Sequence, residues 1–376
     1  MFSANNKISL RQFQILLIFD TLNIFTVLLP SRLSRISGND SIFLIIFGYI
    51  FSVISLFFIT NISSLFPFSS FSNYTAHLLG KSLSCILTIV FSVKIIITAA
   101  LSLNLFSQII NSTILFSTPP AVISLLLLLF SSYSAAKGYE VRARMAEILI
   151  FFFLIPLSFV YILTLSDTDF SAISPLLLTD KRTLFSGSVF ALFSFSSLEF
   201  IFLAYPYVVS SQYIRRSAFS ALSFSALALF FIVFLTVSRF GAAETASLDI
   251  PVIEIMDTID FSTIFIERQN ALVMTVWIIS SFMIINGGIF FSALLIKDLT
   301  CLFSPKGIIN SIASPNIPFI IISAVLIFLI SFIPHDIPEI IGIFDKINYT
   351  LSLFYLYILP VILIIAARVR KGGIPL

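Results

Sequence analysis

Charged residues make up only 10% of this 376-residue chain, which also has just two histidines, two cysteines and one tryptophan. Cys85 and Cys301 are far apart and form no CxxC motif, so we expect neither a disulfide framework nor a metal site. The sequence also lacks a nucleophile–base pair, a metal-ligand cluster and a glycine-rich phosphate loop. We therefore expect that the chain is not an enzyme, needs no cofactor and binds no nucleic acid.

Apolar residues dominate the composition. They account for 59% of the chain, with 44 phenylalanines and a mean hydropathy of +1.10. A water-soluble globule with this composition has too few polar side chains to cover its surface. A helix of about 20 apolar residues crosses the roughly 30 Å hydrocarbon core of a bilayer. Stretches of this kind lie at about 11–30, 41–62, 84–110, 119–136, 145–165, 184–210, 217–238, 270–295, 316–334 and 348–368.

These stretches predict the fold class. Backbone groups in lipid must hydrogen-bond within their own segment, and the stretches are too long and too continuous for barrel strands. We predict an all-α polytopic membrane protein with ten transmembrane helices in a single domain over residues 1–376. The segment before the first stretch has no small-residue cleavage site, so we expect that stretch to be retained.

The basic residues predict the topology. With ten spans, thirteen of the twenty Lys and Arg residues outside the stretches fall on the side of both termini. Cytoplasmic loops carry such an excess, so both termini are predicted to be cytoplasmic. The acidic segment 239–269 is then predicted to lie outside.

Five helices followed by five more insert in opposite directions, which permits an inverted repeat of about 8–165 and 184–370. In transporters built this way, the first helix of each repeat is often interrupted at the binding site. The polar residues at these places are our candidate ligand-binding residues. They are Asp20, Thr21 and Asn23 in the first helix, and Ser194, Ser196, Ser197 and Glu199 in the sixth.

Three ionisable residues fall inside predicted spans at similar depth: Asp20, Lys94 and Glu199. A charge at that depth costs at least ~2.5 kcal/mol, so each is expected to have a partner or a function. For Glu199 we weigh contact with a ligand, proton or coupling charge against a structural hydrogen bond, and for Asp20 a site against interhelical contact. Lys94 is either a buried partner of Asp20 or Glu199, or a fixed cation in place of a coupling sodium ion.

Small residues leave two interpretations open. Ser194, Ser196 and Ser197 either offer hydroxyl groups to a ligand or bond to the carbonyl one turn back. The pair Gly287-Gly288 indicates close packing of two helices.

A charged island occupies residues 138–147, between two apolar stretches. We interpret it as a short aqueous loop or interfacial helix, because such a density of charge is not tolerated in hydrocarbon. It is predicted to form a cytoplasmic ion-pair network, to dock a partner, or to anchor the chain at lipid headgroups. The residues concerned are Tyr139, Glu140, Arg142, Arg144 and Glu147.

The island also carries a resemblance. Its G-x-E-x-x-A-R-x-x-E pattern is similar to that of the spore germinant-receptor B-subunit family, membrane permease-like subunits related to the amino acid–polyamine–organocation transporters. Further similar motifs follow in the same order along nearly the whole chain. They are Ile8-Ser9 with Gln12, Pro30, Glu199 with Tyr205-Pro206, Phe240-Gly241, Phe265-Ile266-Glu267-Arg268 and Trp277-Ile278.

The resemblance implies a LeuT-like fold of ten helices in the spore inner membrane. It also implies that the chain senses a small, amino acid-like nutrient beside an A-subunit and a lipoprotein C-subunit. Two other functions remain open: a secondary transporter of amino acids or related small solutes, and a structural subunit with a vestigial pocket. The same fold serves both receptors and transporters.

The middle of the first helix departs from the family pattern. Family members usually have small residues there, often glycine, whereas this chain has Leu22 and Asn23 and no glycine before Gly38. Either Asn23 interrupts the helix by bonding to nearby backbone, or the site is altered and takes a different ligand.

Overall fold

The computed structural model describes residues 6–166, 168, 173–258, 269–302 and 314–371. Within these ranges all regular secondary structure is helical, apart from one isolated bridge between Ile8 and Val208. The all-α fold class is therefore confirmed. The elements of the first half are α1 (Leu10–Thr21), η1 (Ile24–Leu28), α2 (Leu29–Ser37), η2 (Gly38–Asp40), α3 (Ser41–Leu65), α4 (Phe71–Leu79), α5 (Lys81–Thr113), α6 (Pro120–Ala136) and α7 (Tyr139–Ser166).

The second half begins after the segment that follows α7. Its elements are α8 (Lys181–Leu192), η4 (Phe193–Phe200), α9 (Ile201–Ala204), η5 (Tyr205–Tyr207), η6 (Ser211–Tyr213), α10 (Ile214–Ser247), α11 (Pro251–Thr258), α12 (Gln269–Leu302), α13 (Ile317–Ser331), α14 (Ile337–Ile347), the π-helical turns η7 (Asn348–Ser352) and η8 (Phe354–Ile358), and α15 (Leu359–Lys371).

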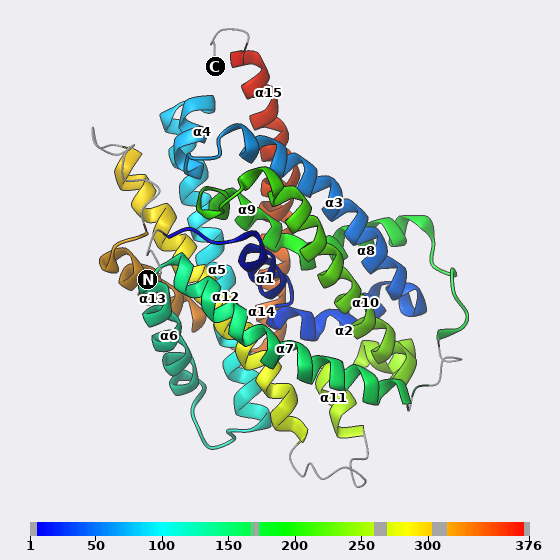
Figure 1. Cartoon of the computed structure of the whole chain (residues 1–376). Helices are drawn as coiled ribbons and strands as arrows, with labels where there is room; N and C mark the ends of the chain where they lie inside the picture. Colours follow the sequence, from blue (N-terminus) through cyan, green and yellow to red (C-terminus); the bar gives the residue numbers. More distant parts are fainter. Residues whose placement is uncertain (1–5, 167, 169–172, 259–268, 303–313, 372–376) are drawn as a thin grey trace.

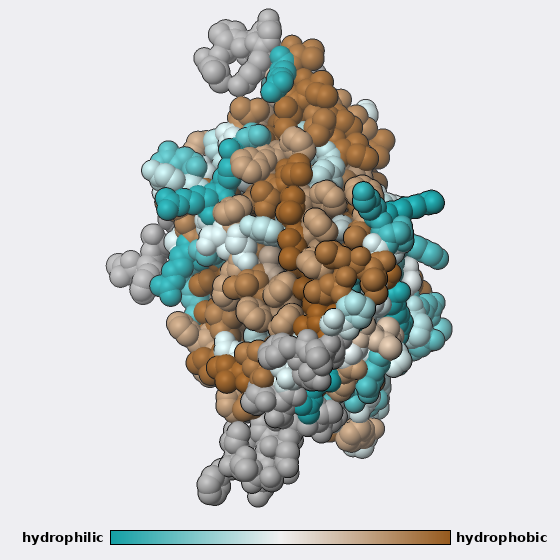
Figure 2. Space-filling view, turned by 90° about the vertical axis from the view of Figure 1, so that its right-hand side faces the viewer, coloured by the Kyte–Doolittle hydropathy of each residue, from teal (hydrophilic) through white to brown (hydrophobic). Residues whose placement is uncertain are grey.

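Seven helical segments of the described chain are long and apolar enough to cross a membrane. Two further apolar helices, α6 and α13, are shorter than the usual span. The count of ten spans therefore stays a prediction, as do the repeat boundaries and the orientation of the termini. Figure 2 shows a broad hydrophobic band down one face of the molecule, with hydrophilic groups on either side.

Two features differ from the sequence prediction, and one predicted motif is not tested. Helices α4 and α11 are short additional elements, because the search for 20-residue apolar stretches passes over helices of nine and eight residues. Helix α7 begins at Tyr139 rather than near 145, so the charged island forms its first turns. The motif Phe265–Arg268 lies outside the described residues.

The long helices α5 and α12 pack against each other over much of their length, and α1 lies near the middle of the bundle (Figure 1). A glycine brings α5 and α12 close together: a Cβ added to Gly288 would lie 2.6 Å from Ala99 Cβ. This contact confirms that Gly288 serves close helix packing. Its neighbour Gly287 makes room for the side chain of Arg142 instead.

We expect Gly288→Val to lower the free energy of unfolding by about 1–3 kcal/mol, because the added methyl groups must separate α5 from α12. Gly342→Ala in α14 is the matched control, since its Cβ would meet nothing within 4 Å. That control is expected to be neutral or slightly stabilising. Denaturant unfolding of both purified variants measures the difference. Equal stability of the two would contradict the close contact at Gly288.

Candidate functional site

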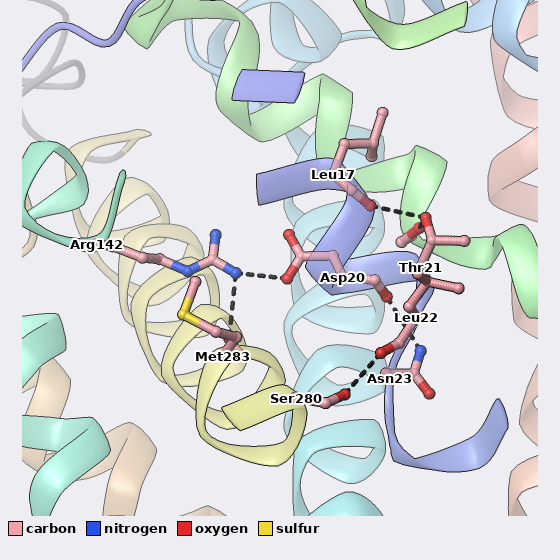
Figure 3. Close-up of polar contacts among 9 residues, drawn as sticks. Leu17, Asp20, Thr21, Leu22, Asn23, Arg142, Ser280 and Met283 are labelled. Carbon is pink, nitrogen blue, oxygen red and sulfur yellow. Dashed lines mark hydrogen bonds and ion pairs between the residues drawn. The ribbon is translucent and has the colours of Figure 1, made fainter. Parts of the chain in front are cut away.

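The first predicted span, about 11–30, is interrupted in its middle. Helix α1 starts with a capping box in which Ser9 and Gln12 bond each other's backbone N–H groups, and it ends at Thr21. Leu22 then leaves the helical region with φ −83° and ψ 57°. The Asn23 side chain donates to the Asp20 carbonyl at 3.0 Å, and Ser280 Oγ donates to the Leu22 carbonyl at 2.7 Å (Figure 3). A polar side chain thus takes the place of the expected glycine by bonding locally to backbone.

A second interruption faces the first. Between α8 and α9 the chain forms the 3₁₀ segment η4, in which Phe195 is non-helical with φ −103° and ψ 15°. Thr21 Oγ1 and Ser197 Oγ lie 2.7 Å apart, and Thr21 also donates to the Leu17 carbonyl at 2.8 Å. A buried hydroxyl contact therefore joins the end of α1 directly to η4.

Lys94 of α5 and Glu199 of η4 form a buried ion pair. The ammonium group bonds to both carboxylate oxygens, and the two side chains are 2% and 6% exposed. Of the two carboxylates considered for Lys94, the structure selects Glu199. Each charge compensates for the burial of the other. Removal of one partner would therefore leave an isolated charge in the protein interior.

Asp20 has a different partner, Arg142, at the start of α7. Arg142 Nη2 lies 2.5 Å from Asp20 Oδ1 and 3.2 Å from the Met283 carbonyl oxygen of α12 (Figure 3). The Arg142 side chain is only 1% exposed. Its interpretation as part of an aqueous loop or a headgroup anchor is therefore wrong. Of the loop and the interfacial helix considered for the island, the structure has a helix. The Arg142 side chain is buried in the bundle, where Asp20 compensates its charge.

The other residues of the island lie at the same helix start but contact different groups. Tyr139 is buried and stacks on Phe290 with ring centroids 5.3 Å apart. Arg144 pairs with Glu140 one turn away at 2.5 Å. Glu147 accepts a hydrogen bond from Gln12 of α1 at 3.0 Å. The segment thus holds α7 against α1 and α12.

A cavity of about 20 Å³ lies between the two interruptions. This volume holds about one water molecule. Six of the candidate residues named from the sequence line it, together with six residues that were not expected from the sequence. The former are Asp20, Asn23, Lys94, Ser196, Ser197 and Glu199, and the latter include Thr98, Ile284, Phe344 and Asn348.

A second cavity of about 20 Å³ shares Asn23 and Phe344 with the first and is also lined by Ser194. Arg32 of α2 and Asp345 of α14 form an ion pair in its wall, and Arg32 lies 4.3 Å from the Phe190 ring centroid. Both residues fall on the side that the charge count assigns to the outside. The opposite charges of Arg32 and Asp345 could have suggested an ion pair from the sequence. Their actual pairing, however, depends on how α2 and α14 pack against each other. In the described ranges, no group of three or more His, Cys, Asp or Glu side chains is placed to hold a metal ion.

The fold is similar to that of solved transporters. A Na⁺-coupled sialic acid symporter in a substrate-bound outward-open state superposes with a TM-score of 0.67 at 12% identity, over 96% of this chain and 80% of that one. The structure of MhsT in complex with L-phenylalanine gives a TM-score of 0.65 at 14% identity, over 94% of this chain and 87% of that one. These similarities confirm the expected LeuT-like fold.

Sequence comparison identifies the relatives. Spore germination protein YndE of Bacillus subtilis is 20% identical over 99% of each chain, and spore germination protein KB of the same organism is 22% identical over 73% of this chain and 74% of its own length. The family profile described as "Spore germination protein" (Spore_permease) matches residues 7–340. This multi-pass membrane chain therefore belongs to the spore germination protein family of permeases.

Proposed function

We propose that this chain is the membrane subunit of a spore germination receptor that senses a small, amino acid-like nutrient between α1 and η4. The observation that carries the proposal is the pair of facing interruptions, joined by Thr21 and Ser197 beside a polar cavity. Interrupted helices of this kind free backbone groups that bind substrates in transporters of similar architecture.

The charges around the cavity favour a ligand with no net charge. Asp20 is paired with Arg142, and Glu199 with Lys94, so the four buried charges cancel. A ligand with a net charge would add an uncompensated charge to this interior, which is costly. A zwitterionic amino acid or a neutral polar solute avoids that cost and still finds hydroxyl, amide and charged groups in the wall.

The cavity in this state is too small for an amino acid, so binding requires a second arrangement of the bundle. Separation of Arg32 from Asp345 would open the way from the predicted outer side through the second cavity. A ligand that binds the opened arrangement more tightly shifts the population toward it, and this shift is the signal. We propose that an A-subunit and a lipoprotein C-subunit receive it in the spore inner membrane.

Ligand binding is tested by changing hydroxyl groups in the cavity wall. Thr98→Val and Ser196→Ala are each expected to weaken binding about 3- to 10-fold, the effect of one lost hydrogen bond. Ser102→Ala, one turn along α5, removes a hydroxyl that bonds only to the Thr98 carbonyl, and serves as control. Single-nutrient germination assays identify the ligand, and titration of purified variants measures its affinity. Unchanged affinity in both wall variants would place the site elsewhere.

A secondary transporter is the second candidate, because one superposed structure is a Na⁺-coupled symporter. Uptake of the identified nutrient into proteoliposomes that contain the purified chain distinguishes the two. Uptake against a gradient would favour transport, whereas binding without uptake favours the receptor. If the purified chain neither binds the nutrient nor transports it, a structural subunit with a vestigial pocket is favoured.

A further inference from the structure

The guanidinium group of Arg142 lies at the interruption of the first helix. It contacts the Asp20 carboxylate at 2.5 Å and the Met283 carbonyl oxygen at 3.2 Å (Figure 3). These oxygens come from two helices that are not neighbours in sequence, α1 and α12. The guanidinium therefore occupies the point where the interrupted helix meets α12.

This point attracts a cation for two physical reasons. The C-terminal end of a helix carries a partial negative charge, and α1 ends at Thr21, one residue after Asp20. The Asp20 carboxylate, itself buried, adds a full negative charge. In transporters with interrupted helices, such helix ends and freed carbonyls coordinate Na⁺ or H⁺.

The packing around the guanidinium fits an arginine. A Cβ added to Gly287 would lie 2.5 Å from Nη2 and 3.0 Å from Cζ, so a larger residue there would displace the guanidinium from its present position. The rings of Tyr139 and Phe291 have their centroids 5.8 and 5.7 Å from Cζ, within the range of cation–π attraction. Nε and Nη1 have no hydrogen-bond partner in the described part of the chain, so these ring faces are what offsets their burial.

We infer that Arg142 is a built-in cation that fills the place of a dissociable ion at the interruption, so that this chain requires no sodium. Lys94 was the other candidate for this function, but it is engaged by Glu199. Arg142 instead contacts the carboxylate of Asp20, in the last turn of the interrupted helix. The inference concerns the occupancy of a cation site and does not depend on which ligand the chain senses.

Thermal unfolding of the purified full-length chain in NaCl, KCl and choline chloride of equal ionic strength tests the inference. The wild-type melting temperature is expected to agree within about 1 °C in the three salts. Arg142→Ala is expected to melt about 5 °C or more lower in choline chloride, because Asp20 is left unpaired. Sodium is expected to recover part of that loss, since Asp20 and the Met283 carbonyl then face an empty space. Arg144→Ala, which removes an exposed pair on the same helix, is the control and should show no sodium effect.

The double variant Asp20→Asn with Arg142→Met removes both charges and keeps similar side-chain volume. It is expected to melt near the wild-type temperature without a sodium effect. A sodium-dependent wild type would overturn the inference even if Arg142→Ala failed to fold. A sodium effect of equal size in the single and double variants would overturn it too, because the ion would then bind elsewhere. None of these readouts uses the nutrient, so failure of the proposed function leaves the result interpretable.

Discussion

Lys94→Met alone is expected to lower the free energy of unfolding by about 3–5 kcal/mol, because it leaves Glu199 as an unpaired carboxylate inside the bundle. Methionine keeps the length and the apolar part of the lysine side chain, so the loss reports mainly on charge. Denaturant unfolding of the purified chain in detergent gives the free energy. Lys181→Met, at the exposed start of α8, is the control and is expected to change it by less than about 0.5 kcal/mol.

The charge of Glu199 decides how the loss of stability in Lys94→Met is interpreted. Adding Glu199→Gln to Lys94→Met removes the stranded carboxylate and is expected to restore most of the stability. Glu199→Gln by itself is expected to destabilise as well, because it strands the ammonium group of Lys94. The double variant is therefore the proper background for testing whether the pair also contributes to nutrient response. Strictly additive effects of the two changes would mean that the pair contributes no coupling energy.

Asn23→Ala is expected to abolish the nutrient response, whereas Asn23→Gly is expected to keep much of it. Asn23 stands where α1 stops, and its side chain bonds to the Asp20 carbonyl. Alanine is the best helix former, so it favours continuation of α1 into η1 and covers the freed backbone groups. Glycine loses the same side-chain bond but keeps the backbone permissive. The rate of germination as a function of nutrient concentration measures the contrast.

A control separates this effect from the loss of one hydrogen bond. Asn286 of α12 is buried, donates to the Ser131 carbonyl at 2.9 Å and lies outside both cavities. Asn286→Ala removes a comparable bond, typically worth ~0.6 kcal/mol in a membrane bundle, and is expected to leave the response intact. Equal, mild effects of alanine and glycine at position 23 would mean that the interruption there does not form the binding site.

The charged island shows where reasoning from sequence failed. Residues 138–147 were assigned to water or to the headgroup layer because an isolated charge is costly in hydrocarbon. Glu140 and Arg144 do pair with each other at the helix start. Arg142, however, enters the bundle and pairs with Asp20, 122 residues away. A hydropathy argument treats each charge alone, so it cannot recognise a charge whose burial is compensated by a distant partner.

The sequence by itself determined the class of fold and the places where two helices are interrupted. Long apolar stretches require helices in lipid, and the polar residues near Asn23 and Ser197 mark where those helices break. Only the tertiary structure decided that Lys94 meets Glu199, that Asp20 meets Arg142 and that Arg32 meets Asp345. These partners lie 105, 122 and 313 residues apart. Their contacts depend on the rotation and crossing of packed helices, which the hydropathy of each stretch leaves unspecified.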